Sequence, residues 1–245
     1  MNTLDMLRWL APVFLAAHTA AGYAADLSPH DIVRQIDQRR LPSGGFEAEL
    51  VIAPFKDGDA QEPGRYVVKA NGDNQVLVEA RNADQRGQKF LTTSSGIFFY
   101  APRTKRAIRM TPLQTLRGQA SIGDISRLHF AEDYDAARPD TVQDKCRDEN
   151  CVVLELRSKS EFATYARILL TARRGREGYE AVSAELFLAS GKQAKLVRFE
   201  PPQKNLPPAA RYIDVINTRL ETAVTYESIK PAKFPASMFN PRSLE

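Results

Sequence analysis

Residues and motifs that commonly mark an enzyme are scarce in this sequence of 245 residues. It contains three histidines, two cysteines and one tryptophan, Trp9. It has no Gly-x-Ser-x-Gly, no His-Glu-x-x-His, no glycine-rich phosphate loop and no EF-hand spacing. His30 falls in the first turn of a predicted helix, and His129 lies between two apolar residues, as a packed histidine does. The sequence therefore predicts no catalytic residue, no metal site and no cofactor.

A long apolar run is also missing. The apolar segment near the amino terminus is short and extends only from Trp9 to Ala17. It follows the single basic residue Arg8, and small residues that end at Ala24 come after it. This layout is typical of a secretory signal peptide over residues 1–24, cleaved after Ala24. The alternative, an amino-terminal membrane anchor, requires a longer apolar segment than this one. Residues 25–245 are expected to form a single exported domain.

Charge is nearly balanced, with a formal net charge of +4. The basic residues are scattered, and the two small clusters, residues 103–106 and 173–176, have the composition of solvated turns. This distribution does not indicate a nucleic-acid partner.

The two cysteines, Cys146 and Cys151, are separated by four residues just before a predicted strand. In an oxidising compartment this spacing predicts a disulfide that closes a hairpin turn. A metal site is the alternative, but two thiolates do not complete a tetrahedral shell and the histidines are far away in sequence.

The segment from Gln88 to Met110 carries more aromatic and branched bulk than any other part of the chain. It predicts two neighbouring strands and the start of a third after Pro102. Strands with large apolar groups on both faces are covered on both faces, or line a cavity that an apolar ligand fills.

The rest of the chain predicts a mainly β protein. One clear helix is expected over Leu27–Arg39, with Ser28 as N-cap and Pro29 in the first turn. The other segments read as sequential hairpins, about ten or eleven strands by their alternation and turn signals. These features predict a curved antiparallel sheet with helices packed inside or across it.

The segment Thr111–Tyr134 breaks the strand pattern. Asp124 is expected to cap a short helix that carries Ile125, Leu128 and Phe130. Such an insertion is either a movable lid over the sheet or a static core helix, and the sequence leaves both open.

Alternation along the strands predicts which side chains line the inner face of the sheet. The candidate ligand-binding residues are Phe46, Leu50, Ile52, Tyr66, Val68, Phe98, Tyr100, Ile108, Met110 and Leu186. A shift of one residue would replace Phe98 and Tyr100 by Ile97 and Phe99. The alternative for every member is that it fills an ordinary core.

Four segments resemble the outer-membrane lipoprotein-sorting protein family, the LolA-like carriers. They are residues 88–91, 96–102, 106–110 and 118–125, and the segment 235–239 near the carboxyl terminus is also similar. Two departures are visible, because the family often has tryptophan where Phe99 stands and an extra residue between Gly123 and Asp124.

This resemblance implies an unclosed, half-barrel antiparallel sheet with helices over its concave face, and an apolar hollow that takes acyl chains. It also implies a monomeric periplasmic carrier that moves lipid or lipoprotein toward the outer membrane. Its expected partners are an outer-membrane acceptor and an inner-membrane exporter of the resistance-nodulation-division type.

Two functions are consistent with these expectations. A carrier of acyl chains requires an inner wall with room for a hydrocarbon guest. An envelope sensor or adaptor of the same fold would have a filled interior and an exposed apolar patch near the Pro201–Pro208 loop or the carboxyl-terminal tail.

Overall fold

The computed structural model describes residues 27–42, 44–127, 129–140, 146, 150–160, 162–203 and 206–244. The predicted signal peptide, residues 1–24, lies outside these ranges. None of the described helices is both long and apolar enough to cross a membrane.

Sixteen strands and three α-helices make up the described chain. The strands are β1 (Phe46–Lys56), β2 (Asp59–Ala60), β3 (Gly64–Ala70), β4 (Val76–Ala80), β5 (Lys89–Thr93), β6 (Gly96–Tyr100), β7 (Ile108–Met110), β8 (Thr115–Arg117), β9 (Ala120–Ser121), β10 (Tyr134–Ala137), β11 (Cys151–Ser158), β12 (Arg167–Gly175), β13 (Gly178–Phe187), β14 (Gln193–Phe199), β15 (Ala210–Asp214) and β16 (Leu220–Pro231). The helices are α1 (Pro29–Arg40), α2 (Ile122–Ser126) and α3 (Phe130–Asp133), with the 3-10 turns η1 (Ala83–Gln85), η2 (Ala236–Phe239) and η3 (Pro241–Leu244).

Fourteen of the strands form one antiparallel sheet that does not close. Its order is β10-β11-β12-β13-β14-β15-β16-β1-β3-β4-β5-β6-β7, with β2 paired to β1. The remaining strands, β8 and β9, pair with each other. The expected mainly β, unclosed antiparallel architecture is confirmed. The expected number of strands was too low, and the missed strands include β2, β8, β9 and β10, which are only two to four residues long.

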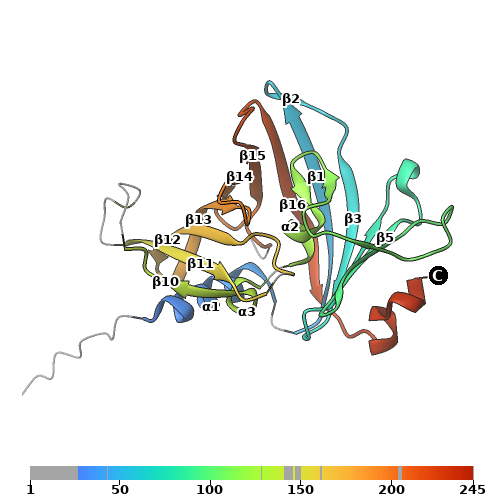
Figure 1. The fold of residues 1–245 in the computed structure, drawn as a ribbon, viewed down its shortest axis with the longest axis horizontal. Helices are drawn as coiled ribbons and strands as arrows, with labels where there is room; N and C mark the ends of the chain where they lie inside the picture. The colour runs from blue at the N-terminus through green and yellow to red at the C-terminus, as the bar shows by residue number, and fades with distance from the viewer. Residues whose placement is uncertain are drawn as a thin grey trace, which may run out of the picture.

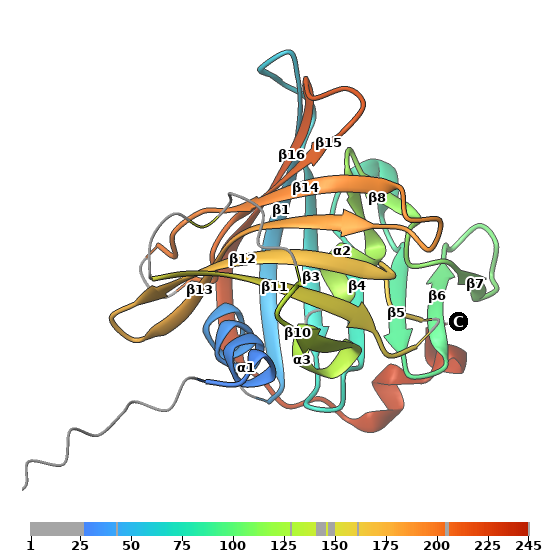
Figure 2. The same ribbon diagram turned by 60° about the vertical axis from the view of Figure 1, so that its left-hand side comes forward.

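The sheet bends so strongly that its two halves face one another. In Figure 2, β11 to β14 run across β1, β3 and β4 at a steep angle. Helix α2 lies between these two walls, and α1 and α3 lie together at one end (Figures 1 and 2). The longest pairing, between β1 and β16, joins the two halves along the middle of the sheet.

Helix α1 follows the local signals in its sequence. The side chain of Ser28 accepts a hydrogen bond from the Asp31 amide at 3.1 Å, and Pro29 occupies the first turn. Ile32, Val33 and Ile36 are fully buried against the sheet. The helix confirms the prediction within one or two residues at each end.

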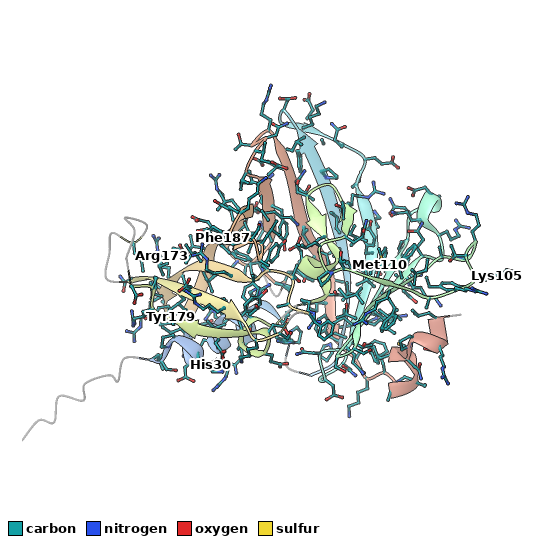
Figure 3. The ribbon with its side chains drawn as sticks, viewed as in Figure 1. His30, Lys105, Met110, Arg173, Tyr179 and Phe187 are labelled. Atoms are coloured by element: carbon teal, nitrogen blue, oxygen red, sulfur yellow. A yellow bond between two sulfur atoms is a disulfide. The ribbon has the colours of Figure 1, made fainter. Side chains whose placement is uncertain are left out.

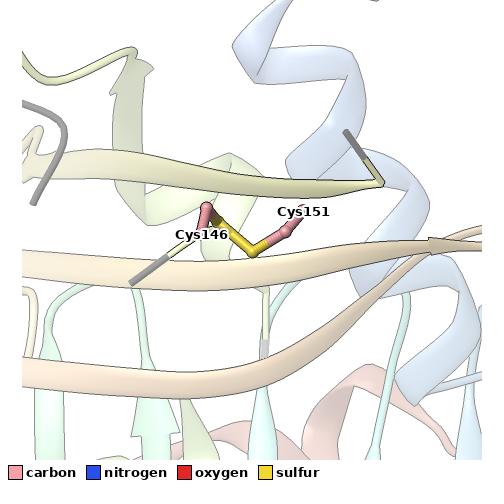
Figure 4. The surroundings of a disulfide bond; sticks show 2 residues. All are labelled: Cys146 and Cys151. Carbon is pink, nitrogen blue, oxygen red and sulfur yellow. A yellow bond between two sulfur atoms is a disulfide. The ribbon is translucent and has the colours of Figure 1, made fainter. Parts of the chain in front are cut away.

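The disulfide between Cys146 and Cys151 is present (Figure 4), with a Cα–Cα distance of 5.3 Å. Cys151 begins β11, whereas Cys146 belongs to no strand. The bond therefore closes a short loop at the start of a strand rather than joining facing residues of a hairpin. Such a small loop contributes roughly 2 kcal/mol at most through the entropy of the unfolded chain.

The two basic clusters lie far apart. Figure 3 shows Lys105 at the tip of the turn between β6 and β7, and Arg173 near the opposite end of the long axis. These clusters therefore do not combine into one basic surface.

Candidate functional site

The concave face of the sheet is lined with apolar side chains that pack on α1 and α2. Six of the predicted ligand-binding residues lie in this interior with at most 3% of their surface exposed: Phe46, Leu50, Ile52, Tyr66, Val68 and Leu186. Met110 is half-buried and packs against the same cluster. The structure thus brings seven of the ten predicted residues to one apolar interior.

The other three predicted residues do not line that interior. Phe98 and Tyr100 pack in a second cluster on the outer face of the sheet, with Leu77, Leu91 and Phe239. Their predicted inward orientation was wrong by one residue, because β6 is apolar on both faces and its alternation does not say which face is inside. Instead, Ile97 and Phe99 contact the inner core.

Ile108 is also misplaced by the prediction, since half of its surface, 50%, is exposed. It lies on β7, the last strand of the described sheet, and pairs with Phe99 of β6 alone. No further described strand covers that edge, so its side chain remains in solvent.

Helix α2 is fixed in the interior by one carboxylate, Asp124. Ser121 is the N-cap, and Asp124 at the third helical position accepts hydrogen bonds from both the Ser121 amide and hydroxyl, at 2.8 and 2.7 Å. This is a capping box, so Asp124 supports the helix start without being the N-cap residue that the sequence predicted. The predicted helix is also broken after Ser126, with Phe130 in α3 and Leu128 outside the described residues.

Two side chains from the opposite half of the molecule, one on β14 and one just before β12, complete the contacts of Asp124. The Lys195 ammonium on β14 donates to Oδ2 at 2.7 Å, and the Tyr165 hydroxyl donates to Oδ1 at 2.8 Å. The Asp124 side chain is 1% exposed and that of Lys195 is 13% exposed. Sequence reasoning missed Lys195 and Tyr165, because nothing in their local sequence indicates a partner 71 or 41 residues away.

The tyrosines around this carboxylate stay protonated. Burial, reinforced by the negative charge of Asp124, raises the pKa of Tyr165 far above its usual value. The same two causes raise the pKa of Tyr212, which lies on β15. Tyr165 can therefore serve as a hydrogen-bond donor to Asp124 at any physiological pH.

A small cavity lies beside this network, between α2, α3 and strands β12 to β15. Water-sized spheres fit into about 30 Å³ of it, which is room for one or two water molecules. Its apolar lining comes mainly from Phe130, Ile168, Ala184, Leu186, Val197 and Phe199, and its polar lining from Arg40, Asp124, Arg127, Tyr134, Thr164, Tyr165 and Tyr212.

A second small cavity, with about 20 Å³ of such space, shares Arg40, Asp124, Phe199 and Tyr212 with the first. Pockets that hold drug-sized ligands are typically about 300–1,000 Å³. The sequence-based expectation of a roomy inner wall is therefore not met in this conformation, because α2 and the wall side chains fill the space.

A wider hollow of about 630 Å³ opens between α1, α3 and the turn after β3. It is lined largely by polar or charged side chains, including His30, Arg34, Asp37, His129 and Glu132. Within the described ranges, no three histidine, cysteine, aspartate or glutamate side chains come close enough together to hold a metal ion. This hollow lacks the continuous apolar wall of the interior.

The open sheet, its apolar concave face and the short helix across it define a LolA-like fold. A LolA superfamily protein from Nitrosomonas europaea is similar over 88% of this chain and 98% of its own, with 24% identity and a TM-score of 0.79. An outer membrane lipoprotein-sorting protein domain from Vibrio parahaemolyticus aligns over 88% of this chain and 97% of its own, with 14% identity and a TM-score of 0.67.

A DUF1329 family protein from Desulfovibrio piger aligns over 89% of this chain and 100% of its own, with 18% identity and a TM-score of 0.66. The chain itself belongs to a family whose model carries the description "Uncharacterized protein" and matches residues 72–245. No curated protein sequence matches it.

Proposed function

We propose that this protein is a carrier that binds the acyl chains of a lipid or lipoprotein between the two halves of its sheet. The observation that carries the proposal is an unclosed sheet with a largely apolar concave face, covered by α1 and by α2, which has only five residues. Each methylene removed from water stabilises a bound chain by about 0.8 kcal/mol. A carrier requires such a surface and a cover, and no catalytic group.

In this proposal the structure corresponds to the closed form, because its interior cavities are small. The two small cavities share part of their lining, chiefly the side chains of Phe199 and Tyr212, which lie between them. An acyl chain joins them if α2 withdraws and these rings turn aside. Asp124 is the contact that holds α2 in place, so the breaking of its bonds to Lys195 and Tyr165 accompanies loading.

The proposed setting is the periplasm. Residues 1–24 would direct export and be cleaved after Ala24, which leaves a monomeric carrier. An inner-membrane exporter of the resistance-nodulation-division type would act as donor, and an outer-membrane acceptor would receive the cargo. The disulfide between Cys146 and Cys151 supports this setting, because such bonds persist in oxidising compartments.

An envelope adaptor that binds a protein partner is the second candidate. The filled interior favours it. The apolar patch that an adaptor requires is not found among the described residues. Their exposed large apolar side chains are Leu27, Ile108, Leu113, Val182 and Ile216. None of these lies in the Pro201–Pro208 loop or the carboxyl-terminal tail.

Two buried alanines allow a matched test. Ala184 is 1% exposed and lines the cavity, whereas Ala48 on β1 is fully buried and does not. Valine at either position overpacks the core by two carbons, which typically costs about 1–3 kcal/mol. Ala184→Val alone also fills the cavity beside α2.

The measurement is the dissociation constant of a fluorescent C12 fatty acid for each purified protein. We expect Ala184→Val to weaken binding about tenfold, which equals about 1.4 kcal/mol. Ala48→Val should bind within about threefold of the wild type. Failure of the folded wild type to take up the fatty acid would reject the carrier and leave the adaptor.

A further inference from the structure

Three buried polar atoms without a hydrogen-bond partner lie on two residues that line the same cavity. In the described part of the chain, the unpartnered buried side-chain atoms are Nε of Arg117, Nε and Nη2 of Arg127, and Oγ1 of Thr164. Arg127 and Thr164 both line the cavity beside α2. A buried donor or acceptor left unsatisfied costs about 1–3 kcal/mol, so a group of three calls for an explanation.

The free atoms of Arg127 have a defined shape. Its Nη1 contacts Oδ1 of Asp133 at 3.2 Å, in a pair whose side chains are only 13% and 14% exposed. Nε and Nη2 form a different edge of the planar guanidinium, where two N–H groups point in parallel. That edge matches the two oxygens of a carboxylate, which arginine binds through a pair of parallel hydrogen bonds.

The hydroxyl of Thr164 is a further hydrogen-bonding group beside Arg127 that has no partner among the described residues. The residue is 8% exposed and lies within the connection between β11 and β12. Gly123 of α2 faces it, and a Cβ on that glycine would collide with the Thr164 side chain and the Pro112 carbonyl. The absence of a side chain at position 123 thus lets Thr164 pack directly against the backbone of α2 at the edge of the cavity.

The charges that face the cavity are compatible with an anion. Arg40 lines it too, with its guanidinium 4.4 Å from the centre of the Phe130 ring and its Nη1 3.4 Å from Oδ1 of Asp37. Asp124 is the carboxylate among the lining residues, and its charge is offset by Lys195 at 2.7 Å. An incoming anion therefore meets the free edge of Arg127 without an unpaired negative neighbour.

We infer that Arg127 and Thr164 form a head-group site for the carboxylate of a single-chain amphiphile, that is, a fatty acid. This inference rests on the proposed function and narrows its ligand. The available space of about 30 Å³ suits a three-atom carboxylate better than a bulkier phosphodiester with two ester links. Once α2 withdraws, as loading requires, the hydrocarbon tail would continue along Ile168, Ala184, Leu186 and Val197, which line the same wall.

Calorimetric titration with laurate and with dodecanol tests the head group, because the two share a chain length and differ in charge. We expect the wild type to bind laurate at least about tenfold more tightly than dodecanol. Arg127→Gln should reduce that preference to below about threefold. Arg219→Gln, at a side chain that is 75% exposed in a distant turn, is the matched control and should keep it.

Thr164→Val is a second test of the site, and this substitution does not remove a buried charge. Valine replaces an unpartnered hydroxyl by a methyl group, so the unloaded protein should be as stable as the wild type or more stable. Its preference for laurate should nevertheless fall. A Thr164→Val protein with the full laurate preference would overturn the site, even if Arg127→Gln does not fold.

The remaining outcomes separate this inference from the carrier itself. Equal affinity of the wild type for laurate and dodecanol would reject the head-group site and leave the carrier intact. No binding of either would reject the carrier. Acetate should bind at least about a hundredfold more weakly than laurate, since it lacks the chain; comparable binding would overturn the assignment to an amphiphile.

Discussion

Asp124 connects three distant parts of the chain through a single side chain. It closes the capping box with Ser121, accepts from Tyr165 before β12 and pairs with Lys195 on β14. A carboxylate that is 1% exposed is tolerated only because these donors replace water. The position of α2 therefore depends on partners that lie far away in sequence.

Replacing Lys195 by methionine should destabilise the protein strongly. Methionine keeps a long unbranched side chain, one heavy atom shorter, but leaves the buried Asp124 without its cation. Breaking a buried pair in this way costs about 3–5 kcal/mol. Urea unfolding measures the effect. Lys230→Met, at a surface pair with Glu47, should remain close to the wild type; equal losses in both variants would contradict the role given to Asp124.

Asp37 on α1 should make the stability of the folded protein depend on pH. Burial raises its pKa above the usual 3.8, although Arg40 and the Ala131 amide oppose the shift. The folded protein therefore binds this proton more tightly than the unfolded chain does. Stability from this group is present at low pH and is lost as the pH rises through the raised pKa.

Asp37→Asn removes that titration while its amide oxygen can still accept from Ala131. The free energy of unfolding of the wild type minus that of the variant should thus decrease as the pH rises from about 4. Urea unfolding of both proteins between pH 4 and 8 checks this. A difference that increases with pH would show that the carboxylate form is favoured by folding.

At the residue scale, alternation identified most of the interior but could not choose a face in β6. Ile97, Phe98, Phe99 and Tyr100 are all large and apolar. The choice depends on the carboxyl-terminal tail, which covers the outer face and shields Phe98 and Tyr100. That contact joins segments about 140 residues apart, and no local pattern reports it.

At the scale of elements, the carboxyl-terminal turns η2 and η3 act as a cover for the outer face of β4 to β6. Phe239 is 3% exposed and Leu244 is 2% exposed, and both pack against Leu77 and Leu91. Phe239 thus anchors the tail, and the two helical turns hold it against the sheet. This cover hides an apolar surface that would otherwise favour association.

Phe239→Ala should therefore uncover that surface. We expect a loss of about 3 kcal/mol in the free energy of unfolding, the lower end of the range for a buried phenylalanine. Chemical denaturation measures the loss, and light scattering should show more self-association. Leu113→Ala, at a side chain that is 43% exposed, is the control and should change neither quantity appreciably. An unaffected Phe239→Ala protein would mean that the tail does not cover the sheet.

Elements defined by local signals were predicted well. Helix α1 has its N-cap and proline, and the β3–β4 hairpin has the turn sequence Asn71–Asn74 between two alternating runs. The pairing of β1 with β16 was not predicted, since it joins residues about 180 positions apart. Only burial of the whole inner face, and no short-range pattern, selects that pairing.

At the scale of the whole molecule, the sheet is open and its interior is closed. The outermost strands, β10 and β7, pair with only one described neighbour each, so the two halves of the sheet can separate without breaking a ladder. Helix α2 and the Asp124 contacts oppose that separation. The proposed carrier would therefore alternate between two states, of which the closed form is the one seen here.

Native mass spectrometry of the exported protein, purified without detergent or organic solvent, tests this account most directly. We predict a population heavier than the polypeptide by the mass of one acyl-chain ligand. That population should disappear after solvent extraction and return on addition of laurate. Folded protein that shows only the polypeptide mass, both as purified and with laurate added, would contradict the central claim.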